Sequence, residues 1–299
     1  MTRIAHACLA LVVEVAFVAC GAEGAPTTHP NPPASVSECA TPEASWIWCD
    51  DFESDRLASY FEFDGAGGRF SRVSGAGYEG SIGMRAQWRP GDQGAGALHV
   101  AFGRTPQAYF KAVDAGSADY REIYWRHWVR TQPGWSGGGA DKLSRATIFA
   151  SPSSWAQAMV GHVYSGGPGP NQDYLYIDPA SGTDSAGALR TTTYNDFANF
   201  RWLGAVRSAT ALFSSTNAGN WYCVEAHIKL NDAGASNGVM EVWINGDLEI
   251  RKSDLNWVGA FNSYGINAVF LEQYWNAGAP GERERFLDGF IVSTQRIGC

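Results

Sequence analysis

The stretch FLDGFIVSTQRIGC at residues 286–299 ends the chain, and WIWCDDFE at residues 46–53 stands near its start. Both stretches alternate large apolar residues with polar ones. This period of two is typical of a β-strand with one buried and one solvated face. The two stretches therefore predict the first and last strands of one β-sandwich, and we expect the domain to end with the second of them.

The first 20 residues have the pattern of an export signal. Arg3 gives a short positive start, and residues 4–19 are mostly apolar. This run is shorter than the roughly 20 residues of a membrane-spanning helix. A signal peptide over residues 1–20 is therefore preferred to a membrane anchor.

Cys20 follows the tripeptide FVA and precedes a glycine, an order that resembles a bacterial lipoprotein cleavage site. Phe17 departs from the leucine that is usual there. We expect lipidation at Cys20 and an outer-membrane or cell-surface position; the alternative is ordinary cleavage and a periplasmic or secreted product. Residues 21–45 form a predicted tether, because a Pro-, Thr- and Ala-rich segment cannot bury a core.

Composition favours one large β-domain over residues 46–299. The chain is 17% charged and 13% aromatic and contains 35 glycines, which suits short strands joined by tight turns better than long amphipathic helices. The formal net charge of −8 argues against nucleic acid or an anionic membrane surface as a partner. We expect a monomer that meets a membrane only through its lipid.

Four cysteines remain after the signal region: Cys39, Cys49, Cys223 and Cys299. An even number in an exported chain predicts disulfides, and four cysteines allow three pairings. We favour Cys39–Cys49, which would fix the start of the first strand, and Cys223–Cys299, which would join the chain end to a central strand. None of the spacings is typical of a zinc site.

Residues 120–130, YREIYWRHWVR, form the most informative predicted strand. One face should pack in the core: Ile123, Trp125, His127 and Val129. The other face is charged and aromatic: Glu122, Tyr124, Arg126, Trp128 and Arg130. Burying these charges in an apolar core would be costly, so this face should meet water or a polar cleft. It suits sugar binding, and a plain solvated face is the alternative.

Four stretches follow in an informative order: NWYCVEAHIKLN at 220–231, GVMEVWING at 238–246, LEQYW at 271–275 and LDGFIVSTQRIG at 287–298. Their order resembles the concanavalin A-like jelly rolls, and most of all the exported polysaccharide-lyase-like proteins of bacteria. The resemblance covers roughly residues 46–299. It implies an all-β, two-sheet antiparallel β-sandwich, a fold that hosts lectins, hydrolases and lyases.

A glycoside hydrolase is the least favoured activity. Retaining jelly-roll glucanases place two carboxylates on one strand face, because nucleophile and acid must lie about 5 Å apart. The nearest pattern here is Glu282-Arg283-Glu284, which follows a Gly- and Pro-rich segment and should be a solvated charge cluster.

The preferred activity is a lyase that cleaves uronate-containing polysaccharide by β-elimination. This reaction needs a cation or amide at the substrate carboxylate and a Tyr, His or Lys to move protons. Residues 121–145 hold five basic and two acidic residues, a net charge of +3, which suits an acidic polysaccharide. The catalytic candidates are Arg126, as the neutraliser, and His162, Tyr164, Tyr274 and Lys142. The expected substrate-binding residues are Tyr124, Trp128, Arg130, Arg145, Glu272 and Gln273.

To act on one substrate, Arg126, His162, Tyr164 and Tyr274 should point into one groove. The alternative function is a non-catalytic, lectin-like surface protein, which needs only the aromatic and Arg face. Blocks that many jelly-roll lyases share, of the Gln-Ile-His kind, are absent from the sequence.

A structural calcium ion is expected from the two terminal stretches. Calcium prefers carboxylate and carbonyl oxygens, and Glu53 and Asp288 could converge if the first and last strands are neighbours. The resemblance also implies calcium on one side of the sandwich. Alternatively, Asp288 caps a turn or pairs with Arg296.

Overall fold

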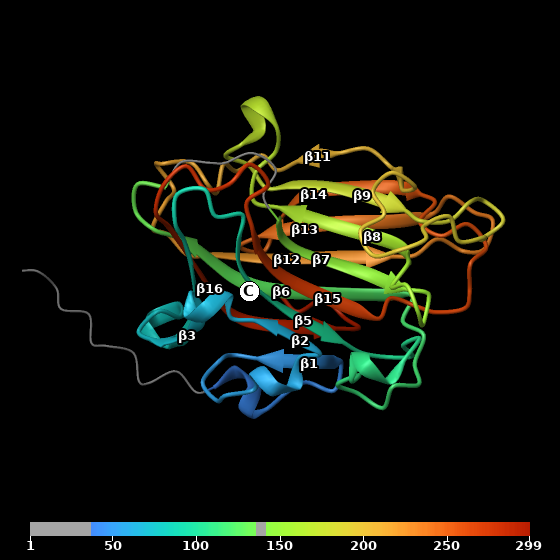
Figure 1. Cartoon of the computed structure of the whole chain (residues 1–299), viewed down its shortest axis with the longest axis horizontal. Helices are drawn as coiled ribbons and strands as arrows, with labels where there is room; N and C mark the ends of the chain where they lie inside the picture. The colour runs from blue at the N-terminus through green and yellow to red at the C-terminus, as the bar shows by residue number, and fades with distance from the viewer. Residues whose placement is uncertain (1–36, 136–141) are drawn as a thin grey trace, which may run out of the picture. The chain divides into compact units, whose positions relative to one another are not determined.

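A computed structural model describes residues 37–135 and 142–299. The predicted signal peptide, Cys20 and the first part of the predicted tether lie outside these residues. The described residues form two antiparallel β-sheets that share one apolar core (Figure 1). The predicted all-β, two-sheet sandwich is confirmed.

Sheet A has the strand order β14-β13-β12-β6-β16-β4-β3, and β1 also pairs with β16. Its strands are β1 (Trp46–Asp50), β3 (Phe70–Ser74), β4 (Ile82–Trp88), β6 (Glu122–Thr131), β12 (Tyr222–Lys229), β13 (Gly238–Ile244), β14 (Asp247–Leu255) and β16 (Arg283–Ser293). The first and last strands are thus neighbours, with Trp46 opposite Ser293 and Asp50 opposite Phe290.

Sheet B has the order β10-β9-β8-β7-β15-β5-β2, and β11 also pairs with β9. Its strands are β2 (Glu62–Asp64), β5 (Gly94–Ala101), β7 (Lys142–Phe149), β8 (Gln157–Tyr164), β9 (Tyr176–Ser181), β10 (Arg201–Trp202), β11 (Val206–Arg207) and β15 (Ala268–Tyr274). The helices in the described part of the chain are six 3-10 turns: η1 (Glu38–Ala40), η2 (Leu57–Ser59), η3 (Ala66–Gly68), η4 (Tyr78–Gly80), η5 (Ala108–Phe110) and η6 (Gly169–Asn171).

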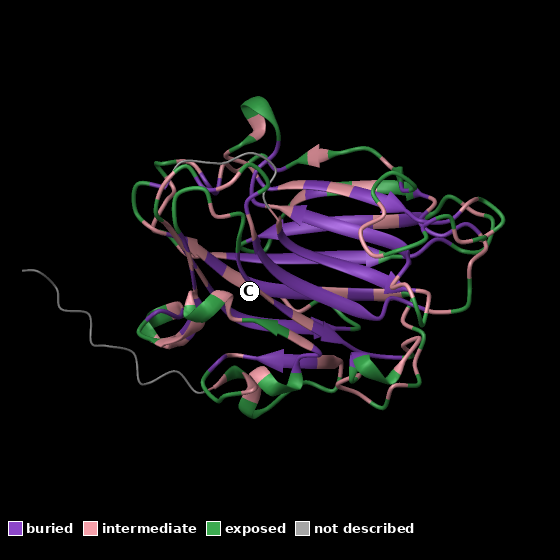
Figure 2. Ribbon diagram, in the orientation of Figure 1, coloured by how far each residue is buried: buried purple, intermediate pink, exposed green. Residues whose placement is uncertain are grey.

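The core lies between the sheets, and Figure 2 shows the central strands buried and the connecting loops largely exposed. Strand β6 follows the predicted alternation: its expected core face is at most 1% exposed at Ile123, Trp125, His127 and Val129. The Trp125 indole N–H donates to the Ser144 hydroxyl at 3.0 Å and so joins sheet A to sheet B. The side chains on the outer faces of the two sheets lie outside this core and can contact a ligand or another segment of the chain.

Both favoured disulfides are confirmed, Cys39–Cys49 and Cys223–Cys299. The first holds part of the predicted tether against β1, so residues 37–40 belong with the sandwich. A helix of the length and apolarity needed to cross a membrane is absent from the residues that the structure describes.

Candidate functional site

Three side chains stand in one row across the outer face of sheet B, where its strands end. In the strand register, Lys142 lies opposite Tyr164 on β8 and opposite Tyr274 on β15. Cross-strand partners have Cβ atoms about 5 Å apart, so these side chains are neighbours. The Lys142 amine lies 4.6 Å from the centre of the Tyr274 ring. Three of the predicted catalytic residues are therefore brought together.

The row lies in a groove made of two adjoining hollows. The Lys142 end, of about 490 Å³, is lined by Lys142, Tyr164, Asn195, Phe197, Trp202, Tyr274 and Asn276. The Asp64 end, of about 620 Å³, shares Tyr274 and is lined by residues of β2, β5 and β15, among them Glu62, Phe63, Asp64 and His99, and by Tyr109 of η5. Since β10 and β2 are the outer strands of sheet B, the groove crosses the sheet.

Lys142 has the surroundings of a general base. Its side chain is 13% exposed, and burial lowers its pKa despite the Glu272 carboxylate 3.8 Å away. The nearby charge of Arg145 lowers the pKa further. A lysine with a lowered pKa supplies the neutral amine nearer to neutral pH, which is the form that takes up a proton.

Arg145 forms the floor beneath the row. It is 0% exposed, and it donates to Glu272 Oε1 at 3.1 Å and to Asn195 Oδ1 at 2.7 Å. It also donates to the Tyr194 hydroxyl. Arg145 and Glu272, both expected to bind substrate, therefore pair with each other below the groove surface. Gln273, expected in the same role, is 1% exposed.

His162 lies on the groove side of sheet B, beneath Tyr164. Its ring stacks on the Tyr164 ring at 4.9 Å, and Arg145 Nη1 lies 3.3 Å from its Nε2. A guanidinium can only donate, so Nε2 accepts and the ring is neutral. Burial, followed by the charges of Arg145 and Lys142, lowers the His162 pKa well below its usual value. Proton transfer by His162 stays a prediction; its contacts favour a role in positioning Tyr164.

Asn195 is a candidate that the sequence interpretation missed. Its side-chain oxygen accepts from Arg145, which leaves the amide NH₂ group to donate, and the residue lines the Lys142 end. Its φ is 55°, a left-handed conformation that Asn adopts more readily than most residues. The threonines at 191–193 and the following Asp196 are typical of an ordinary turn, which hides this position. The sequence signal that could have identified Asn195 is its position between two aromatic residues, Tyr194 and Phe197.

Arg126 is placed elsewhere. It lies on β6 in sheet A, is 3% exposed, and donates to Glu38 Oε1 at 2.9 Å and to the Gly289 carbonyl at 3.3 Å. The expected common groove of Arg126 with His162, Tyr164 and Tyr274 is therefore wrong. Alternation along a strand predicts which face is polar, but it does not predict the sheet to which the strand belongs.

The other predicted binding residues of β6 are also on sheet A. Tyr124 stacks on His227 with ring centres 4.2 Å apart, and Trp128 stacks on Tyr78 at 4.1 Å. Arg130 lies 4.4 Å from the centre of the Phe286 ring and 4.9 Å from that of Trp221. These side chains contact neighbours on sheet A or in the segments that adjoin its strands, away from the groove.

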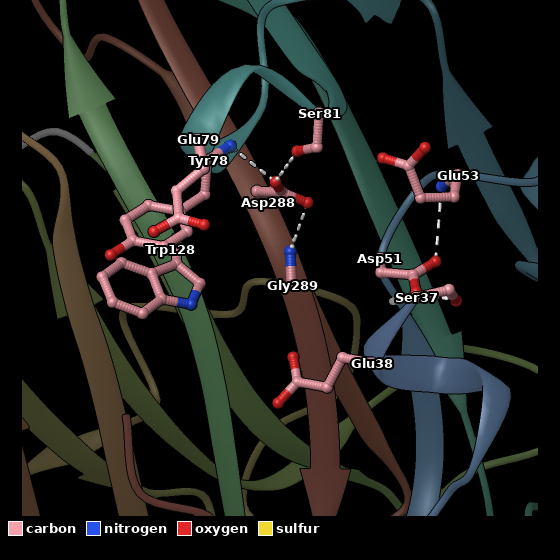
Figure 3. Close-up of a pocket in the computed structure, with 10 residues that line it drawn as sticks. All are labelled: Ser37, Glu38, Asp51, Glu53, Tyr78, Glu79, Ser81, Trp128, Asp288 and Gly289. Carbon is pink, nitrogen blue, oxygen red and sulfur yellow. Dashed lines mark hydrogen bonds between the residues drawn. The ribbon is translucent and has the colours of Figure 1, made fainter. Parts of the chain in front are cut away.

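The two expected calcium ligands line one pocket beside the first and last strands (Figure 3). Asp288 accepts from the Tyr78 N–H at 2.7 Å and the Ser81 hydroxyl at 2.8 Å, and Glu53 accepts from the Ile82 N–H at 2.8 Å. Asp288 thus caps a turn, as in the alternative reading. The described residues contain no group of three or more His, Cys, Asp or Glu placed to hold a metal. Calcium stays a prediction.

Known proteins resemble this chain in structure alone. No protein-family model and no curated sequence matches it. The marine PL-14 alginate lyase from Aplysia kurodai matches with a TM-score of 0.56 at 12% identity, over 84% of this chain and 100% of that one. Alginate lyase vAL-1 from Chlorella virus matches with a TM-score of 0.54 at 12% identity, over 80% of this chain and 94% of that one. Endo-β-1,4-glucuronan lyase from the fungus Trichoderma reesei matches with a TM-score of 0.50 at 14% identity, over 84% of this chain and 92% of that one.

These likenesses concern the fold. The chain has the two-sheet sandwich of polysaccharide lyases, and the resemblance predicted from its sequence is confirmed at that level.

Proposed function

We propose that this chain is an exported polysaccharide lyase that cleaves uronate-containing polysaccharide by β-elimination. The observation that carries the proposal is the row of Lys142, Tyr164 and Tyr274 in an open groove, with the pKa of Lys142 lowered by burial. The fold likeness to alginate and glucuronan lyases supports it. An acidic polysaccharide is the partner that it implies.

The reaction needs one base and one acid. Neutral Lys142 removes the proton on C5 of the uronate, next to the carboxylate. The electron pair forms the C4–C5 double bond as the glycosidic bond from C4 to oxygen breaks. Tyr164 donates a proton to the departing oxygen; burial, followed by the charge of Asp178, raises its pKa, which keeps the hydroxyl protonated until then.

The substrate carboxylate also needs a partner, because removal of the C5 proton places negative charge on it. The Asn195 amide is a candidate donor at the Lys142 end, and Arg145 fixes its orientation. A donor held in place before reaction stabilises such charge without reorganisation. Asn195 thus replaces Arg126 in the role of neutraliser.

The alternative is a glycan-binding protein without catalysis. Phe197 and Trp202 are 41% and 40% exposed at the Lys142 end, with ring centres 6.1 Å apart. Exposed rings that offer an apolar face can bind a sugar with no proton transfer.

Export belongs to the proposal because two disulfides are typical of oxidising compartments. Lipidation of Cys20, a monomeric state and a structural calcium ion stay predictions. Mass spectrometry of the mature N-terminal peptide tests the first of these.

The test offers alginate, glucuronan and unsulfated glycosaminoglycans and follows the ultraviolet absorbance of the unsaturated uronate. We expect product from at least one polymer. Tyr164→Phe should lower kcat/KM by about a hundredfold, and the matched control Tyr222→Phe, on β12 of sheet A, should leave it unchanged. Absorbance from no polymer, together with retained binding, rejects the lyase in favour of the binding protein.

A further inference from the structure

The large apolar side chains that the described residues expose gather at the two ends of the groove. Phe197 and Trp202 line the Lys142 end, whereas Phe63 and Tyr109, 39% and 47% exposed, line the Asp64 end. The one other such residue in the described part lies on β14 of sheet A. The groove therefore offers an aromatic surface on either side of Tyr274, long enough for more than one sugar.

The two ends differ in charge. At the Lys142 end, Lys142 is the one charged side chain among the described lining residues. At the Asp64 end the lining includes Glu62, Asp64 and Glu272 and neither Lys nor Arg. Glu272 pairs with Arg145 in the floor. Glu62 and Asp64 therefore determine the sign of the charge that a bound sugar meets there.

Both carboxylates have fixed positions at the groove. Glu62 Oε2 lies 2.9 Å from His99 Nδ1, and the Tyr109 hydroxyl donates to Glu62 Oε1 at 3.1 Å. The hydrogen bond to His99 lowers the pKa of Glu62 and favours its charged form. Asp64 is exposed and accepts from the Ala66 N–H at 2.8 Å. A ligand at this end thus faces negative charge beside an aromatic surface.

We propose that the groove selects a copolymer in which a uronate at the Lys142 end is followed by a sugar without a carboxylate at the Asp64 end. A polymer of uronate alone would bring a carboxylate beside Glu62 and Asp64, and like charges this close repel. The inference rests on the proposed function for the position of the reacting uronate. It narrows the substrate from acidic polysaccharides in general to mixed ones.

The test compares polyglucuronate with an unsulfated polymer in which glucuronate alternates with N-acetylglucosamine. Both kcat/KM for cleavage and Kd for oligosaccharides of equal length are measured. We expect a preference for the copolymer of about fivefold or more, as expected for one or two exposed charge contacts. The preference should shrink as salt is raised, because salt screens exposed charges.

Asp64→Asn separates charge from other differences between the polymers. The variant keeps a side-chain oxygen for the Ala66 N–H, and it should reduce the preference about threefold by improving the use of polyglucuronate. The control Asp247→Asn removes an exposed carboxylate on β14 of sheet A and should change nothing.

The outcomes are distinct. Equal or better use of polyglucuronate, or a preference that Asp64→Asn does not alter, overturns the inference and leaves the lyase proposal standing. If neither polymer is cleaved, the ratio of the two Kd values alone supports or overturns the inference. The lyase proposal fails only if no polymer of the wider acidic panel, alginate included, gives product.

Discussion

The two outer faces of the sandwich carry similar side chains and differ in what lies over them. On sheet A, Glu38 covers Arg126, and the chain end covers Glu225, which accepts from the Ile297 N–H at 2.6 Å and the Gly298 N–H at 3.1 Å. On sheet B, within the part of the chain that the structure describes, the row that contains Lys142 lies in an open groove. Arginine and aromatic side chains on a strand therefore mark a functional face only where no other segment covers them.

The largest effect on stability is expected where the chain end is tied to sheet A. Cys223→Ser with Cys299→Ser opens a loop of 76 residues and should lower the free energy of unfolding by about 4 kcal/mol. Cleavage should be unchanged while the protein is folded, because the groove is on the other sheet. Urea unfolding and kcat/KM check both statements. As a comparison, Cys39→Ser with Cys49→Ser opens a 10-residue loop and should cost about 3 kcal/mol or less.

His127 lies in the core between the two sheets. Its lowered pKa predicts that the folded protein loses stability in acid. Burial, followed by Arg285 and Arg126, lowers its pKa to about 3, against about 6.5 in an unfolded chain. Below pH 6.5 the unfolded chain takes up a proton that the folded chain does not, so stability falls as pH falls. From pH 7 to 5 this loss is about 2 kcal/mol. His127→Gln should remove that part of the pH dependence in urea unfolding; an unaltered dependence would contradict the assignment.

The smallest effect on stability is expected at Glu38, the residue that covers Arg126. Glu38→Gln leaves the guanidinium charge buried with a neutral partner and should cost about 1–2 kcal/mol of stability. The groove should keep its activity. A loss of cleavage in a folded Glu38→Gln protein would show that the covered face takes part in function.

Much of the fold could be predicted from local patterns. Alternation located β6 and its core face, and the four cysteines paired as favoured. The alternation of apolar and polar residues along a strand does not indicate which sheet the strand joins, because that depends on pairing with strands distant in sequence. For this reason Arg126 was expected beside His162, although β6 and β8 belong to different sheets.

The site could be predicted only in part, because it combines residues of regular strands with a residue of a loop. Lys142, Tyr164 and Tyr274 come together because their strands are neighbours. Asn195 comes from a loop whose path depends on Arg145 and on Gln157, which accepts from the Asn195 N–H at 2.9 Å. These partners lie 50 and 38 residues away in sequence, and no local pattern indicates them.

The contrast between the open groove and the covered face is tested by comparing Lys142→Met with Arg126→Met, each shown to be folded at the assay temperature. The measurement is kcat/KM on a polymer that the unmodified protein cleaves. We expect a loss of about a hundredfold or more for Lys142→Met. We expect a value within about twofold of the unmodified protein for Arg126→Met, whose side chain lies on sheet A. Full activity in Lys142→Met, or loss of activity in Arg126→Met alone, would contradict this contrast.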